Sequence, residues 1–133
     1  MKQFTLPKTE RLYLRNAVSE LFAKGSSFMV FPYRIVYRLL PEDDSQEARV
    51  AIMTIAPKKR FKHAVDRNRV KRLSREAYRL AKLPLVELCT EKHCKLAFAM
   101  LYSDNKFLTF AETQSRMAKI IRNLSQKIRE KDV

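Results

Sequence analysis

The stretch KKRFKHAVDRNRVKRLSREAYRLAK, residues 58–82, decides how this chain folds and what it can bind. It carries 11 basic side chains against two acidic ones, so a net charge of +9, out of +14 for the whole chain, lies in 25 consecutive residues. Apolar side chains nevertheless recur at spacings of three and four residues, at Val70, Leu73, Ala77 and Leu80. This pattern predicts a helix that begins near Asp66 as its N-cap, with an apolar stripe toward a core and a basic face outward.

Four of the basic side chains recur at intervals of four residues and so form one row along the helix: Arg67, Lys71, Arg75 and Arg79. Like charges at this spacing destabilise an isolated helix by about 0.2–0.5 kcal/mol per pair. A solvated helix face usually mixes charges of both signs, so we favour a phosphate-binding face over a merely solvated one. A helix on a membrane surface is disfavoured because the fold needs the apolar stripe. Composition does not distinguish DNA from RNA.

The remaining composition describes a small folded protein. The chain has 133 residues, 28 Lys and Arg against 14 Asp and Glu, and a hydrophobic content of 46%. This length suits one domain with a core, and the apolar content excludes a disordered basic tail. No apolar run approaches the roughly 18 residues that span a bilayer, and residues 1–7 lack the apolar run of a secretory signal. Two cysteines make no disulfide framework, so we expect a cytoplasmic location.

Outside the basic stretch, three segments have the patterning of strands. Residues 28–40 are rich in β-branched and aromatic side chains, with Pro32 expected at a sheet edge or bulge. Residues 49–56 are apolar on both alternations, as in a strand covered on both faces. Residues 95–102 alternate large apolar side chains with alanines. The acidic residues 41–47 predict a solvated turn.

Two further helices flank these strands. The first, over residues 14–24, is expected to stop at Gly25, the only glycine, in a left-handed conformation. The last begins with a capping box formed by Thr109 and Glu112. Pro84 is expected to close the basic helix.

Together these elements predict an α+β protein. The expected architecture is a small single-domain α/β sandwich, in which three helices pack on a mixed sheet of about four strands. The domain is expected to span residues 1–133, with residues 1–10 as a flexible N-terminal segment. The sequence shows no linker and no internal repeat.

Residues 64–79, AVDRNRVKRLSREAYR, closely resemble the signature of the bacterial ribonuclease P protein component. That signature centres on Arg-Asn-Arg, followed by an apolar residue, Lys-Arg-Leu and a further Arg. Residues 6–12 resemble the family's N-terminal segment, and residues 56–59 resemble its strand end and basic turn. The late strand and the capped last helix also match, so the resemblance covers nearly the whole chain and implies the ribonuclease P protein-like fold.

The resemblance also implies a function. Ribonuclease P is a ribonucleoprotein endonuclease that removes the 5′ leader of precursor tRNA, and in bacteria its RNA subunit holds the catalytic Mg²⁺ and carries out the chemistry. The protein is then expected to have no catalytic residue, no metal site and no organic cofactor. Its partners would be ribonuclease P RNA and precursor tRNA, with neither DNA nor a membrane.

The family's binding residues carry over to two sets of positions in this sequence. The residues that would face the catalytic RNA are Lys58, Lys59, Arg67, Asn68, Arg69, Lys71, Arg72 and Arg75. Phe22 and Tyr37 match aromatic positions of the groove for the single-stranded leader, which the sheet and the signature helix would form, and Tyr33 is a further odd position of the same strand. Stacking on bases in that groove would tolerate any sequence. Core packing is the alternative for Phe22.

The chain departs from the family pattern in the turn before the signature helix. It reads Arg60-Phe61-Lys62-His63 where many members have a shorter turn that contains glycine, which alters the backbone and adds charge. Val18 stands where many relatives carry an aromatic residue. Met100 stands where they often carry Arg, so we assign it no RNA contact.

No group of side chains forms a recognisable protein active site. His63 and His93 are the only histidines available as bases near neutral pH. Cys89, His93 and Cys94 fall short of the four ligands of a usual zinc site, so free cysteines beside a loop are the favoured interpretation. The acidic residues 42–47 lie in a turn without apolar support and predict no Mg²⁺ site.

A basic helix of this kind would also suit other functions. A ribosome-associated or chaperone-like RNA-binding protein would bind RNA with the same salt dependence, without accelerating precursor-tRNA processing. A DNA-binding factor is disfavoured because no helix-turn-helix is recognisable. A nuclease made of protein alone would need clustered carboxylates to hold Mg²⁺.

Overall fold

The computed structural model describes residues 6–130, which form one four-stranded sheet and four α-helices. The strands are β1 (Ser26–Val30), β2 (Tyr33–Pro41), β3 (Val50–Ile55) and β4 (Cys94–Tyr102). The helices are α1 (Arg15–Lys24), α2 (Ala64–Ala81), α3 (Leu83–Glu91) and α4 (Phe110–Glu130), and a 3-10 helix, η2, spans Lys8–Glu10. The strand order is β1-β2-β4-β3, with β3 parallel to β4 and the other pairs antiparallel. The predicted α+β class and mixed sheet are confirmed.

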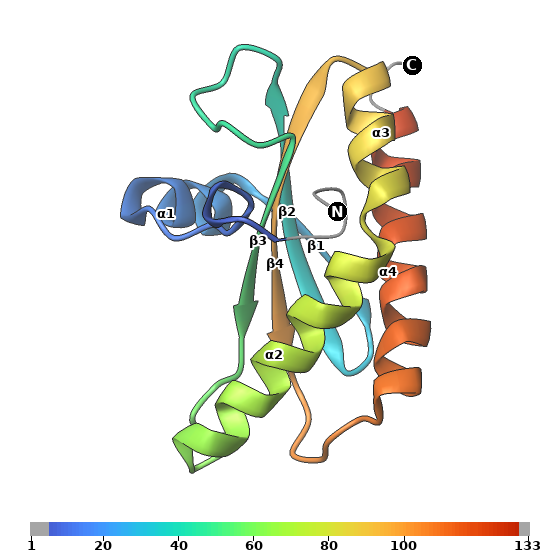
Figure 1. Cartoon of the computed structure of the whole chain (residues 1–133). Coiled ribbons are helices and arrows are strands. Elements are labelled where there is room, and N and C mark those ends of the chain that lie inside the picture. Colours follow the sequence, from blue (N-terminus) through green and yellow to red (C-terminus); the bar gives the residue numbers. More distant parts are fainter. Residues whose placement is uncertain (1–5, 131–133) are drawn as a thin grey trace.

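The helices lie in two unequal layers on the sheet (Figure 1). α2, α3 and α4 cover one face, whereas α1 alone crosses the other. The parallel pair of β3 and β4 requires a crossover connection, which α2 and α3 supply. The turn after β3 and the loop after β4 therefore lie at the same end of the sheet, at the bottom of Figure 1. This end carries the start of the basic helix.

The alternation predicted for β4 is confirmed, and it separates the two layers. Its large side chains, including Phe98 and Met100, are fully buried against α2, α3 and α4. Its alanines Ala97 and Ala99 face α1 in a smaller cluster around Leu21. Small side chains on that face allow α1 to approach the sheet closely.

The segment expected as one strand over residues 28–40 is instead a hairpin. β1 and β2 pair in antiparallel register from Val30 opposite Tyr33, and a Phe31–Pro32 turn with a cis peptide bond separates them. Apolar content alone predicts a strand but does not show that it reverses direction. Pro32, expected at an edge or bulge, lies in the turn itself.

The helix count was wrong by one. Pro84 does not end the helical region, because it occupies the first turn of α3, where proline's missing N–H leaves no hydrogen bond unmade. The expected start of α2 also shifts, since the N-cap is His63 and Asp66 lies in the first turn.

Gly25 ends α1 as predicted, but its conformation differs from the expected one. Its φ of −78° is not left-handed. A Cβ at this position would lie 2.8 Å from the carbonyl oxygen of Tyr37, so the close approach of α1 to β2 requires glycine.

The capping box of α4 forms as predicted. The Thr109 amide donates to Glu112 Oε1 at 2.9 Å, and the Glu112 amide donates to Thr109 Oγ1 at 3.1 Å. None of the helices between residues 6 and 130 is both long and apolar enough to cross a membrane.

Residues 1–5 of the expected N-terminal segment 1–10 lie outside the described residues. In the described part of this segment, Glu10 accepts a hydrogen bond from Lys82 Nζ at 2.6 Å, between side chains that are largely buried.

Candidate nucleic-acid interface

Helix α2 fixes the orientation of the basic stretch. Its buried side chains are Val70, Ser74, Ala77 and Tyr78, so the predicted apolar stripe is displaced. Leu73 is only half-buried and Leu80 is exposed, because the helix rests on a face that includes the polar Ser74. The predicted RNA-facing side chains then lie outside: Lys58, Lys59, Asn68, Arg69 and Arg72 are exposed, and Arg67, Lys71 and Arg75 are partly so.

The acidic side chains pair with other basic groups, including Arg79, the last member of the predicted basic row on α2, and Lys82, which follows the helix. The ion pairs are Glu10–Lys82, Glu20–Arg38, Glu42–Arg49 and Glu76–Arg79. Within residues 6–130, the basic side chains predicted to face RNA form no ion pair: Lys58, Lys59, Arg67, Arg69, Lys71, Arg72 and Arg75. The preceding turn and the part of α2 up to Arg75 therefore form an uncompensated positive patch, which suits a polyanion.

Arg67 also stabilises the turn before α2. Its Nη1 donates to the carbonyl oxygens of Phe61 and Lys62 at 3.0 and 2.9 Å, which holds the turn before α2 against the helix. Its Nε and Nη2 atoms form no hydrogen bond among the described residues and stay available to an anion.

Arg75 stands in a group of like charges. Burial, together with the charges of Arg11 and Arg72, lowers the pKa of Arg75. Its Nη1 also lies 3.4 Å from Thr54 Oγ1, at the edge of hydrogen-bond distance. Three guanidinium groups without a carboxylate favour a bound anion. Sequence reasoning did not include Arg11 in this group, because only the bridge between Arg11 and Ile52 brings it to β3.

Arg69 lies over an aromatic ring from a distant loop. Its Cζ is 4.2 Å from the ring centroid of Phe107, which follows β4. Phe107 in turn stacks on Phe61 of the turn before α2, with a centroid distance of 4.9 Å. Neither aromatic residue was among the predicted site residues.

The expectation that Phe22, Tyr33 and Tyr37 line one groove is wrong in its geometry. Phe22 projects from α1 and is 43% exposed, so core packing does not account for it. Tyr33 is 1% exposed and its hydroxyl lies 2.8 Å from Ser74 Oγ, on the opposite face of the sheet. Tyr37 is half-buried on that same face, beside the ring of Phe28. Odd-numbered positions of β2 face α2 and α4, whereas the even-numbered ones face α1.

The α1 face of the sheet contains an open row of side chains that sequence reasoning missed. The strand register places Met29, Arg34, Leu101 and Ile55 side by side across all four strands. Met29 and Arg34 are exposed, and Leu101 and Ile55 are half-buried. This row is an apolar floor with a guanidinium group within it.

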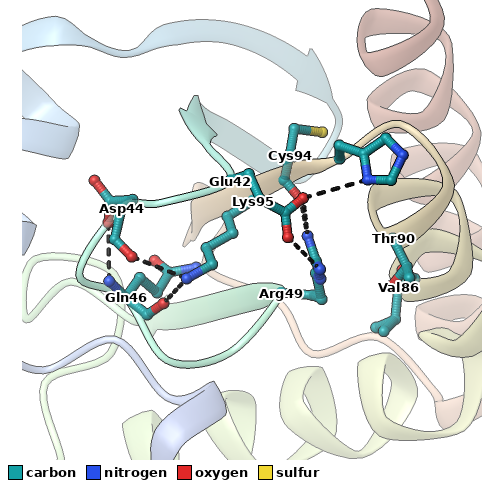
Figure 2. Close-up of polar contacts among 9 residues, drawn as sticks. Glu42, Asp44, Gln46, Arg49, Val86, Thr90, Cys94 and Lys95 are labelled. Atoms are coloured by element: carbon teal, nitrogen blue, oxygen red, sulfur yellow. Dashed lines mark hydrogen bonds and ion pairs between the residues drawn. The ribbon is translucent and has the colours of Figure 1, made fainter.

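The acidic loop after β2 is fastened to the sheet rather than arranged around a site (Figure 2). Glu42 binds Arg49 through both carboxylate oxygens, at 2.5 and 2.9 Å, and Arg49 holds the pKa of Glu42 below its ordinary value. Arg49 also donates to the carbonyl oxygen of Cys94 at 3.2 Å, and Lys95 donates to the carbonyls of Asp44 and Gln46.

The residues considered for metal binding are dispersed. Cys89 and Cys94 are buried and form no disulfide, whereas His93 is exposed, with its Nδ1 3.6 Å from Glu42 Oε2. Across residues 6–130, no three His, Cys, Asp or Glu side chains gather in a way that could hold a metal ion.

Comparison with known proteins gives the same family throughout. The family model for Ribonuclease P matches residues 6–125. Two relatives from Porphyromonas gingivalis, each named Ribonuclease P protein component, are 40% and 41% identical to this chain, over 87% of its length and 83% of theirs. A relative of the same name from Chlorobium phaeobacteroides is 30% identical over 90% of this chain and 88% of its own.

Solved structures agree with the fold. The Staphylococcus aureus RNase P protein matches with a TM-score of 0.64 and 16% identity, over 85% of this chain and 93% of that one. The protein from Thermotoga maritima matches with a TM-score of 0.65 and 17% identity, over 86% and 96%. The signature helix, the shared fold and the extent of the sequence matches lead to one conclusion: this chain belongs to the ribonuclease P protein family, RNA-binding protein components of a tRNA-processing ribonuclease.

Proposed function

We propose that this chain is the protein subunit of a bacterial ribonuclease P in which the RNA subunit carries out the cleavage. The observation that carries the proposal is the uncompensated positive patch on α2 and its preceding turn. The protein's contribution is to bind the RNA subunit and the substrate leader together and to screen the repulsion between these two polyanions. With precursor tRNA as its substrate, the protein is proposed to act in the bacterial cytoplasm.

The RNA subunit docks on α2 and on the turn before it. Arginine predominates there, and its planar fork binds phosphate oxygens bidentately. Asn68 lies exposed between Arg67 and Arg69 and can both donate and accept hydrogen bonds to sugars and base edges. The proposed contacts are Lys58, Lys59, Arg67, Asn68, Arg69, Lys71, Arg72 and Arg75, joined by Arg11.

The 5′ leader lies on the α1 face of the sheet. Phe22 supplies an exposed ring on which a base can stack, and the open row of Met29, Arg34, Leu101 and Ile55 supplies an apolar floor. Contacts of this kind recognise an unpaired strand without selecting its sequence. Tyr33 and Tyr37 face the other way and take no part.

A second groove on this face is less suitable for a leader. It lies between α1 and the acidic loop, with Leu12, Leu40 and Ala51 among its lining residues. Its lining includes the carboxylates of Glu20, Asp44 and Glu47 and the guanidinium groups of Arg11, Arg15 and Arg38, so acidic and basic side chains balance there. The open row contains the guanidinium group of Arg34 and no carboxylate, which favours it as the path of the leader.

In this proposal the RNA subunit, not the protein, binds the catalytic Mg²⁺. The carboxylates of the protein do not fit a Mg²⁺ site, because Glu42 is occupied by Arg49 and the described acidic side chains do not converge. We therefore assign no step of the cleavage to a protein side chain.

Cleavage of a 5′-extended precursor tRNA at low Mg²⁺ tests the proposal. The three arms are the protein alone, a bacterial ribonuclease P RNA alone, and the two combined. We expect cleavage only from the combination. Cleavage by the protein alone would contradict the assignment of the chemistry to RNA. Failure to rescue the RNA would favour the alternative, an RNA-binding chaperone.

A further inference from the structure

We propose that Phe107, in the loop between β4 and α4, is a positioning residue that holds Arg69 in place for binding the RNA subunit. Phe61, in the turn before α2, supports Phe107 from behind. This inference rests on the proposed docking of RNA on α2 and adds a second segment of the chain, remote in sequence, to that surface.

The side chains of Arg69, Phe107 and Phe61 form a stack in which the guanidinium group of Arg69 is outermost. The guanidinium carbon of Arg69 lies 4.2 Å from the centroid of the Phe107 ring, within the range of a cation–π interaction. The rings of Phe107 and Phe61 are nearly parallel, with an interplanar angle of 26°. Phe61 is 5% exposed and lies against Tyr102, so the stack is anchored in the core.

The loop that carries Phe107 is fixed on both sides. The Tyr102 hydroxyl donates to the carbonyl oxygen of Lys106 at 2.6 Å, one residue before Phe107. The capping box of Thr109 and Glu112 begins two residues after it. The ring of Phe107 thus presents a defined surface, although 37% of the residue is exposed.

This support distinguishes Arg69 from two of its neighbours on α2. Among the described residues, Lys71 and Arg72 have no aromatic, hydrogen-bond or ion-pair partner. A long free side chain loses rotamer freedom when it binds. Arg69 is held before RNA binds, so it loses less rotamer freedom. Its guanidinium N–H groups form no hydrogen bond among the described residues and stay available to an anion.

The stack also includes the turn in which the sequence departs from the family pattern. Arg60-Phe61-Lys62-His63 replaces a shorter glycine-containing turn, and Phe61 provides the buried contact that holds the longer turn against the end of the sheet. Arg67 fastens the same turn from the helix side. Phe61 and Phe107 therefore act as one unit, with Arg69 as its exposed end.

A double-mutant cycle tests the inference with the full-length protein and ribonuclease P RNA. The variants are Arg69→Ala, Phe107→Leu and the pair, with Phe107→Tyr as the variant that keeps the ring. We expect Arg69→Ala to weaken binding about tenfold or more. Phe107→Leu should weaken it about two- to fivefold. In the Arg69→Ala background, Phe107→Leu should have no further effect, and Phe107→Tyr should bind as the original protein does.

The outcomes separate this inference from the proposed function. If Arg69→Ala weakens binding but Phe107→Leu does not, or if the two effects simply multiply, Phe107 does not act through Arg69. If Arg69→Ala itself has no effect, the docking role of Arg69 fails and the inference fails with it. Tyr13→Ala is the matched control, because it removes a different exposed ring under a cation, Lys8 Nζ at 5.1 Å, and should leave RNA affinity unchanged.

Discussion

The hydroxyl of Tyr33 lies 2.8 Å from the hydroxyl of Ser74, and this buried contact joins the second strand of the sheet to the middle of the basic helix. Ser74 Oγ also donates to the carbonyl oxygen of Val70 at 2.8 Å. Burial raises the pKa of Tyr33, which keeps the hydroxyl protonated as a hydrogen-bonding group. The pair therefore sets how α2 lies on the sheet and which basic side chains point outward.

Tyr33→Phe should reduce stability and leave leader recognition unchanged. The substitution removes one buried hydrogen bond while Ser74 keeps Val70, so the free energy of unfolding should fall by about 1 kcal/mol. Urea unfolding measures this change, and Kd values for precursor and mature tRNA with the holoenzyme measure recognition. Tyr37→Phe is the matched control, because the hydroxyl of Tyr37 forms no hydrogen bond among the described residues. A selective loss of precursor affinity in Tyr33→Phe would contradict the structural role.

Arg69→Ala should weaken binding of the RNA subunit and flatten its salt dependence. With about six phosphates contacted, the slope of log affinity against log salt should be roughly −4 to −5. Loss of one cationic contact should cost about 1.5–3 kcal/mol and reduce the slope by about 1. Binding titrations over a range of KCl concentrations measure both quantities.

The control for this prediction is Arg79→Ala, on the same helix and with the same change in charge. Arg79 forms an ion pair with Glu76, so its removal should leave the slope nearly unchanged. Equal effects of the two substitutions would mean that overall charge, not the patch on α2, governs binding.

Phe22→Ala should weaken the affinity of the holoenzyme for precursor tRNA while leaving mature tRNA unaffected. Stacking of one base on an aromatic side chain contributes about 1–3 kcal/mol, and mature tRNA has no leader to stack. Parallel Kd measurements with both ligands test this. Tyr37→Ala, on the other face of the sheet, should lower stability without changing the ratio of the two Kd values. A normal ratio in Phe22→Ala would remove Phe22 from the leader path.

Features of the fold that depend on residues close together in the sequence were predicted correctly. The alternation of β4 and the capping box of α4 depend on residues within a few positions of each other, and both are confirmed. Which side chains of β2 face α2 could not be predicted in the same way. Both the odd-numbered and the even-numbered positions of that strand carry apolar side chains, so only packing decides which set meets α2. Tyr33 and Tyr37 were therefore grouped with Phe22, which lies on the other face of the sheet.

The contact between Arg69 and Phe107 was equally inaccessible from sequence. The two residues are far apart in the chain, and they meet because β3 and β4 run parallel and end at the same edge of the sheet. Pro84 shows a different difficulty, since proline ends one helix and begins another with equal ease. Here α2 ends at Ala81 and α3 begins at Leu83, so a single residue separates the two helices.

Glu112→Gln should make the protein less stable near neutral pH and indistinguishable from the original at low pH. The backbone N–H and the hydroxyl of Thr109 hold the pKa of Glu112 below its ordinary value of 4.5. A carboxyl group with a lowered pKa in the folded state stabilises the protein above its unfolded pKa, and that contribution disappears as pH falls through the folded pKa. The difference in Tm between the two proteins should therefore be present at pH 7 and close below pH 4.5. Glu130→Gln removes the same charge from the other end of α4, where a carboxylate opposes the helix dipole, so it should be neutral or slightly stabilising at pH 7. A Tm difference for Glu112→Gln that persists unchanged at pH 3 would show that the ionised carboxylate is not what caps the helix.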